Sequence, residues 1–345
     1  MRTKLLGAGA LAALTFGLAA ASAAPALADS APMGPVVCDR ACLQDVVDQY
    51  LAAVVAHDAH HLNLAPDIRY TENGQELALN DGLWGTVSAL GTYKHYFLDP
   101  RSQQAGFYGV LKENGHDIIL ALRIKLEGKQ VSEIETVIGR SGLGTAGPNG
   151  AANLEAMGKP DDVWLQDNPD HASREDIVRV SNMYFSALQN DDGKGDYSFF
   201  ADDCWRLENG MQTTSGPHPN PPRPSPPPAP GAAAPAARPA PSPFSLSCKG
   251  GFQTGSLQVV TRIRDRRFPI VDEQKGVAFS FAFFDHNAQV HDFTLTDGTK
   301  MHGGLQAPFT WEIAEAFRID KGKIHVVEAV LNNAPYGMKG GWDGR

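Results

Sequence analysis

The sequence predicts an α+β protein made of two halves, each with one helix followed by an antiparallel sheet. Two observations support this prediction. Short motifs recur in the same order in both halves, and each half changes from helical to strand periodicity along the chain. Because strands follow strands without alternating helices, the pattern argues against a parallel βαβ arrangement.

The internal repeat rests on several ordered matches. Residues 47–51 match 180–185, Glu72-Asn73-Gly74 matches Glu208-Asn209-Gly210, 122–124 match 317–319, and 131–135 match 324–328. One shared tripeptide is a weak signal. Several matches in one order indicate two copies of a structural unit.

The elements follow from periodicity and turn residues. A helix is predicted over residues 42–57, and a second begins near Ser173, whose spacing to Asp176 is typical of an N-cap. The turns Glu127-Gly128 and Lys321-Gly322 tolerate positive φ and would close hairpins. Strands are predicted over 107–110, 118–126, 131–138, 277–284, 309–319 and 324–331.

Residues 1–28 are predicted to be a signal peptide. Arg2 and Lys4 precede an apolar run, and Ala26-Leu27-Ala28 fits a cleavage site. The alternative is a retained membrane anchor, but the run is rich in small residues and short for a bilayer span. We therefore expect a periplasmic or secreted protein with no membrane contact after cleavage.

The predicted domains are separated by changes in composition. We expect a first domain over 36–140, a Gly-rich linker over 141–172 and a second domain over 173–345. Residues 216–243 form a proline-rich insertion in the second domain, because so much proline prevents sheet or helix interiors. The alternative for this insertion is a docking peptide in a polyproline conformation.

The four cysteines of an exported chain are expected to form disulfides. Cys204 and Cys248 flank the proline-rich insertion, and a bond between them would stabilise the fold by roughly 3 kcal/mol or more. Cys38 and Cys42 are close enough to pair if the first helical turn is distorted. Four cysteines allow three pairings, and the sequence does not choose among them.

Composition also argues against several functions. The 30 Lys and Arg against 39 Asp and Glu give a net charge of −9, whereas nucleic-acid binding usually needs a basic surface. The sequence has no G-x-S-x-G elbow, phosphate loop or dinucleotide fingerprint. No histidine pair has the spacing of a helical metal site. We expect neither a cofactor nor a metal.

Four motifs carry a resemblance to a known family: residues 38–43, 69–74, 82–85 and 335–338. They resemble exported tandem proteins of the SnoaL-like, or nuclear-transport-factor-two-like, superfamily. The resemblance implies two cone-shaped domains, each a curved antiparallel sheet wrapped on an N-terminal helix, with a pocket at the wide end. It also implies a monomer with an internal pseudo-dimer. Because this superfamily hosts many enzymes and binding proteins, it implies no single activity.

The final hairpin supplies a candidate acid/base pair. Simple pairing about Lys321-Gly322 places Glu315 opposite Glu328 and Arg318 opposite His325. Two opposed carboxyl groups among apolar side chains would raise the pKa of at least one of them. The alternative is a register shifted by one residue, or two glutamates exposed to water.

The first half offers a similar arrangement with Glu135 opposite Leu120. The predicted catalytic roles are Glu328 or Glu135 as base, Glu315 or a histidine as acid, and Arg318 or Arg123 as electrostatic support. The predicted ligand-binding residues combine aromatic surface with polar groups; they are Glu72, Tyr70, Trp84, Tyr93, His95, Glu208, Arg206 and Trp311. The alternatives are that the aromatic residues fill the core and that the Asn-Gly pairs only make turns.

These observations predict an exported, cofactor-independent enzyme that transfers protons on a small organic molecule, as a lyase, dehydratase or isomerase. The alternative is a noncatalytic exported protein for ligand binding or assembly. A binding protein would show ligand-dependent melting shifts without forming a product.

Overall fold

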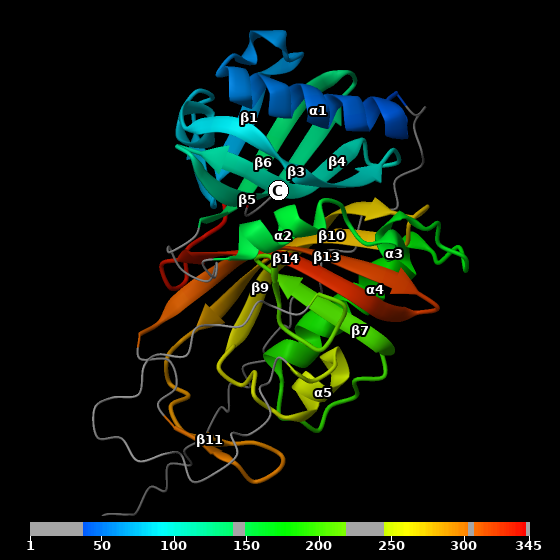
Figure 1. Ribbon diagram of the computed structural model, residues 1–345, viewed down its shortest axis with the longest axis vertical. Helices are drawn as coiled ribbons and strands as arrows, with labels where there is room; N and C mark the ends of the chain where they lie inside the picture. Colours follow the sequence, from blue (N-terminus) through cyan, green and yellow to red (C-terminus); the bar gives the residue numbers. More distant parts are fainter. Residues whose placement is uncertain (1–36, 141–148, 219–244, 303–306, 343–345) are drawn as a thin grey trace, which may run out of the picture.

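A computed structural model describes residues 37–140, 149–218, 245–302 and 307–342. The predicted signal peptide and residues 219–243 of the predicted insertion lie outside these ranges. Two six-stranded sheets pack against each other, and each carries a long helix on its outer face (Figure 1). The fold is α+β with two cone-shaped halves, as the sequence predicts.

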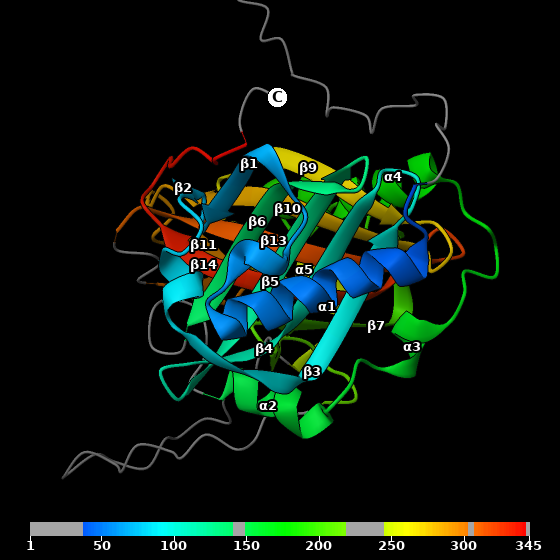
Figure 2. The same ribbon diagram turned by 90° about the horizontal axis from the view of Figure 1, so that it is seen from above.

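The first sheet has the strand order β2-β1-β6-β5-β4-β3. It is antiparallel except where β1 lies parallel to β6, which refines the predicted all-antiparallel sheet. Figure 2 shows α1 lying across the strands of this sheet. The elements are α1 (Arg40–Ala56), η1 (Ala59–His61), β1 (Leu64–Glu72), β2 (Gln75–Leu77), η2 (Gly82–Gly85), β3 (Val87–Asp99), β4 (Gln104–Glu113), β5 (His116–Glu127) and β6 (Gln130–Arg140).

The second sheet has the corresponding order β8-β7-β14-β13-β10-β9, with β7 parallel to β14. Its helix is α4 (Arg174–Gln189), which Ser173 caps by accepting a hydrogen bond from the Asp176 backbone N–H, as predicted. The other elements are β7 (Phe200–Glu208), β8 (Met211–Gln212), α5 (Cys248–Gln253), β9 (Arg262–Asp272), β10 (Val277–His286), β11 (Phe293–Thr294), β12 (Lys300–Met301), β13 (Phe309–Asp320) and β14 (Lys323–Ala334).

Three apolar cores follow from the alternation of side chains along the strands. One lies between α1 and the outer face of the first sheet, and another lies between α4 and the outer face of the second. The third joins the two inner faces and includes Phe97, Tyr108, Phe279 and Phe281. Because both faces of each sheet are covered, β5, β6, β13 and β14 are buried along nearly their whole length, including the acids and arginines that they carry.

The predicted linker contains two short helices, α2 (Gly150–Met157) and α3 (Asp162–Leu165). Leu154 and Trp164 from these helices are buried in the core between the sheets. The structure selects one of the three possible pairings: Cys38 bonds Cys42, and Cys204 bonds Cys248.

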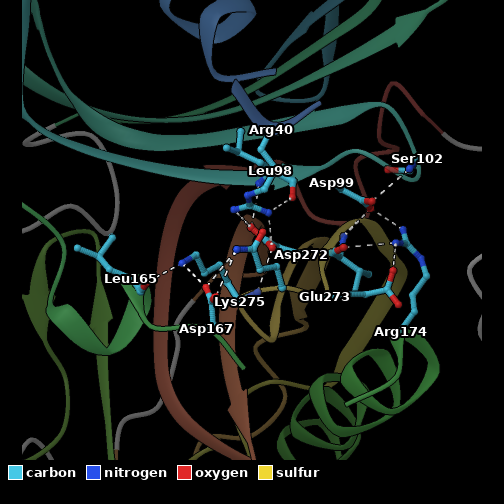
Figure 3. A network of polar contacts seen from close by, with 12 residues as sticks. Arg40, Leu98, Asp99, Ser102, Leu165, Asp167, Arg174, Asp272, Glu273 and Lys275 are labelled. Carbon is cyan, nitrogen blue, oxygen red and sulfur yellow. Dashed lines mark hydrogen bonds and ion pairs between the residues drawn. The ribbon is translucent and has the colours of Figure 1, made fainter. Parts of the chain in front are cut away.

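An arginine at the start of α1 reaches from the first half to the second (Figure 3). Arg40 donates to both carboxylate oxygens of Asp272, at 2.7 and 2.8 Å, and to the backbone oxygen of Leu98 at 3.0 Å. Asp272 ends the edge strand β9, and Leu98 lies near the end of the edge strand β3.

The first residue of α4 makes the reciprocal contact (Figure 3). Arg174 donates to Asp99 at 2.6 Å and to the backbone oxygen of Val271 at 3.3 Å. Each half therefore supplies an arginine from its helix and an aspartate from its edge strand. This exchange is the pattern of contacts expected across a two-fold axis. The two contacts are called the Arg–Asp latches below.

Candidate functional site

A cavity of about 150 Å³ lies inside the second half. Strands β7, β13 and β14 form one side, α4 forms another, and the segment after α5 closes a third. The apolar part of the wall includes Leu188, Val260, Phe284, Ile313 and Leu331. Four residues predicted from the sequence line this cavity: Arg206, Glu208, Trp311 and Glu315.

Strand register brings two carboxyl groups to the cavity from different strands. Glu315 of β13 lies opposite Ala329 of β14, and Ala329 lies beside Glu208 of β7. Residues in register share a face, so all three point toward α4. Because alanine has no side chain beyond Cβ, the space between the two glutamates stays open.

A buried arginine lies next to the carboxyl groups. Arg206 is two residues before Glu208 on β7 and therefore shares its face. Its guanidinium donates to the Tyr184 hydroxyl of α4 at 3.0 Å and lies 3.7 Å from the Glu208 carboxylate. The charges of Arg206 and Glu208 thus balance each other at the cavity floor.

The environment of Glu315 favours its protonated form. Burial, followed by the nearby charge of Glu208, raises the pKa of Glu315 to about 8, although Arg206 opposes the shift. Glu315 is only 2% exposed. This carboxyl group therefore carries a proton at neutral pH and can lose it under mildly basic conditions.

Four buried polar atoms around the cavity have no hydrogen-bond partner within the described residues. They are Arg206 Nε, Glu315 Oε2, Thr213 Oγ1 and Trp311 Nε1. A buried polar group without a partner costs about 1–3 kcal/mol. Their gathering around one cavity indicates a place where a bound molecule can supply the missing partners.

The segment after α5 holds the cavity wall by local contacts. α5 begins at Cys248, whose disulfide joins it to Cys204 on the strand that carries Arg206. Further on, the Leu257 backbone N–H donates to the buried Asp191 carboxylate at 3.0 Å. Gly251 and Leu257 both line the cavity, so these contacts fix the wall opposite the sheet.

The corresponding place in the first half has different residues. Register there aligns Leu122, Thr136 and Glu72, so leucine stands where the second half has Glu315. Glu72 accepts hydrogen bonds from the Tyr70 hydroxyl, the Leu83 backbone N–H and the Arg140 guanidinium, at 3.0, 2.6 and 3.1 Å. Its carboxylate is therefore satisfied by the protein.

The predicted opposition of Glu315 and Glu328 is wrong. A bulge at His325 shifts the register, so Arg318 pairs with Val326 and Glu328 pairs with Ala316. A shift of one residue turns a side chain to the other face. Glu328 consequently lies between the sheets and not beside Glu315.

Glu328 instead joins the two halves. It accepts a hydrogen bond from the Tyr93 hydroxyl at 2.6 Å and lies 2.7 Å from His95 Nδ1. Tyr93 and His95, which were predicted to bind a ligand, are buried in this contact.

The pairing predicted in the first half is also wrong, because Arg123 and not Leu120 lies opposite Glu135. Arg123 donates to Glu135 at 2.7 Å, and Arg267 contacts the same carboxylate from the second half. Burial disfavours the charge of Glu135, but Arg267 and Arg123 outweigh it and hold its pKa below the usual range. These residues form an ion cluster between the halves.

Arg318 lies away from the cavity as well. Its guanidinium donates to the backbone oxygens of Val163 and Ile319, at 2.9 and 2.8 Å, and to that of Lys275. Trp84 packs in the first core, with its ring edge-on to Tyr50.

Sequence reasoning missed Tyr184, Thr213 and Ala329 at the cavity. Tyr184 lies among the buried residues of α4, and apolar periodicity does not reveal the role of its hydroxyl. It also missed Glu312, a buried acid between the sheets, because strand register could not be fixed in advance.

A larger hollow of about 670 Å³ lies between α2, α3 and the edge of β7. It holds the contact of His218 with Asp161, at 2.6 Å. Among the described residues, none that lines this hollow has a buried polar side-chain atom without a partner. The smaller cavity has the stronger chemical definition.

Comparisons with known proteins find a family of unknown function and distant structural neighbours. A family model for a domain of unknown function, DUF8021, matches residues 170–331, and no curated protein matches. A de novo designed protein with a curved β-sheet has a TM-score of 0.25 and 11% identity, covering 34% of this chain and 96% of that chain. A steroid delta-isomerase from Pseudomonas aeruginosa has a TM-score of 0.24 and 8% identity, covering 37% and 90%. Similarity at this level says nothing about activity.

Within the described residues, no helix is long and apolar enough to cross a membrane. The same residues include no group of three or more histidine, cysteine, aspartate or glutamate side chains suited to a metal ion.

Proposed function

We propose that the cavity of the second half is the active site of an enzyme that transfers protons on a small organic molecule, as a lyase, dehydratase or isomerase. The observation that carries the proposal is the pair of carboxyl groups, Glu208 and Glu315, facing one space across Ala329. The two groups differ in environment, as an acid and a base must.

The environments suggest a role for each group. Glu208, paired with Arg206, is the carboxylate that removes a proton from a carbon of the ligand. Glu315 donates its proton to the ligand atom that gains electron density, and Arg206 supports the resulting negative charge. In an isomerisation the cycle closes when Glu208 returns its proton to another carbon of the ligand and the protonated ligand atom gives its proton back to Glu315. In an elimination the protonated group leaves, Glu208 releases its proton to solvent, and Glu315 takes one from solvent. Apolar walls limit competition from water.

Hydrogen exchange tests this proposal without a known substrate. The mature protein would be incubated in D₂O with a panel of small carbonyl and hydroxy compounds, and deuterium at carbon would be measured by mass spectrometry. For any compound that exchanges, Glu315→Gln and Glu208→Gln should each reduce the rate at least a hundredfold. Glu72→Gln, which alters the equivalent glutamate of the first half, should leave the rate unchanged.

Two outcomes would contradict the proposal. Exchange that survives both cavity variants would place the chemistry elsewhere. Saturable melting shifts with no exchange for any compound, preserved in Glu315→Gln, would favour a noncatalytic binding protein.

We also propose that the chain is exported and is a monomer whose halves pair as two subunits would. The paired cysteines support an oxidising compartment, and the reciprocal Arg–Asp latches support the internal pairing. Mass spectrometry of the mature chain should find Asp29 at its start. Light scattering should give the mass of one chain, and a dimer mass would contradict the proposed state.

A further inference from the structure

The size of the second-half cavity limits what it can hold. At about 150 Å³ it matches the volume of an apolar cavity that takes up benzene. A ligand of roughly six to eight non-hydrogen atoms therefore fits. Fused rings and long chains do not fit between α4 and the sheet.

The polar atoms of the cavity call for a ligand that accepts hydrogen bonds. The unpartnered atoms Arg206 Nε and Trp311 Nε1 can only donate, and the hydroxyl of Thr213 can donate. Protonated Glu315 also donates through its carboxyl group. The rest of the cavity wall is apolar. An apolar ligand that carries acceptor oxygens therefore complements both the wall and its donors.

The charges of the cavity call for a neutral ligand. Arg206 carries one positive charge and is balanced by Glu208, 3.7 Å away. Glu315 adds no charge while it holds its proton. A carboxylate or an ammonium group would therefore bring an unbalanced charge into a buried site, which is unfavourable.

We propose that this cavity selects neutral carbonyl compounds with a single ring and rejects carboxylates and amines of the same shape. The inference rests on the proposed function, because it names the ligand class of the same site. Four probes with a single ring lie within this size range: cyclohexanone, cyclopentanecarboxylate, cyclohexylamine and methylcyclohexane. Only the first combines neutrality with an acceptor oxygen.

Binding of each probe to the full mature chain would be measured by calorimetry at pH 7. Cyclohexanone should bind at least tenfold more tightly than the other three probes. Thr213→Val, which replaces the hydroxyl with a methyl group, should weaken cyclohexanone about tenfold and leave methylcyclohexane unchanged, because it removes a donor and no apolar surface. Circular dichroism would verify that the variant folds.

A change of pH gives an independent readout. Glu315 loses its proton above about pH 8, and its carboxylate would then repel the carbonyl oxygen. Binding of cyclohexanone should weaken about tenfold between pH 7 and pH 9.5. Glu315→Gln, which keeps a donor at every pH, should show no such loss.

The outcomes separate this inference from the proposed function. Equal or tighter binding of cyclopentanecarboxylate, with hydrogen exchange still dependent on Glu315, would contradict the ligand class and leave the proposed active site intact. If no probe binds, and if Ala329→Leu fills the cavity but leaves hydrogen exchange intact, both the proposed ligand class and the proposed active site are wrong.

Discussion

Two buried glutamates, one in each sheet, have opposite surroundings. Glu72 accepts three hydrogen bonds and is fixed as a structural carboxylate. Glu315 occupies the row that holds Leu122 in the first half, and one of its oxygens has no partner in the part of the chain that the structure describes. A polar group in this position weakens the core, and enzymes commonly accept such a loss of stability at their active sites.

The free energy of unfolding should depend on pH through Glu315. Its pKa rises from 4.5 to about 8 in the folded state, so its contribution is fully present below about pH 4.5 and is lost as the pH approaches 8. The side chain of the Glu315→Gln variant cannot ionise, so the variant does not lose this stability as the pH rises. At pH 8 we expect the variant to be more stable than the parent by roughly 2–4 kcal/mol, measured by urea denaturation.

The matched variant Glu72→Gln should change stability in the other direction. It places an amide where the Leu83 and Tyr70 donors point, so we expect a loss of roughly 1–3 kcal/mol at the same pH. At pH 4 the advantage of Glu315→Gln should disappear. An advantage of equal size at pH 4 and pH 8 would contradict the assigned ionisation.

At the scale of elements, the hairpin of β13 and β14 decides which acids reach the cavity. Its bulge directs Glu315 and Ala329 to α4, and Ala316 and Glu328 to the other sheet. Two alanines on the same hairpin therefore face different surroundings. Ala329 borders open space, whereas Ala316 is packed between the sheets.

Leucine substitutions at these two alanines should distinguish a position beside the cavity from a position in the packed core. Ala329→Leu fills the space between Glu208 and Glu315, so exchange and probe binding should fall at least tenfold, with a stability cost below about 1 kcal/mol. Ala316→Leu overpacks the core between the sheets and should cost about 1–3 kcal/mol. Thermal melting and the exchange assay distinguish the two effects. An unstable Ala329→Leu would mean that the space is not open.

At the scale of the whole molecule, the two sheets are held by apolar contact and by the Arg–Asp latches. Their arginines differ in exposure, since the Arg40 side chain is 28% exposed and the Arg174 side chain only 7%. Both aspartates are buried. Removing either arginine leaves an aspartate without its charged partner, and the cost should grow with burial.

Arg174→Gln should therefore destabilise the protein more than Arg40→Gln. We expect losses of roughly 3–5 kcal/mol and roughly 1–2 kcal/mol, measured by urea denaturation. The double variants Arg174→Gln/Asp99→Asn and Arg40→Gln/Asp272→Asn complete two mutant cycles. Equal costs for the two arginines would show that burial does not control the strength of the latches.

Periodicity and turn residues predicted much of the secondary structure. The stripe on α4, its Ser173 cap and the turn at Lys321-Gly322 are local features, so neighbouring residues determine them. The four residues Arg206, Glu208, Trp311 and Glu315 were also proposed from the sequence. Their common cavity was not, because their strands become neighbours only in the folded sheet.

The sequence alone determined the two α+β halves, because apolar spacing and caps act within one element. The tertiary structure decided which acids face the cavity, because one bulged residue, His325, reverses the direction of Glu328. It also decided that Glu135 and Arg123 join the halves, since their partner Arg267 comes from a distant strand. Contacts between distant strands depend on register and packing, which are properties of the assembled sheets.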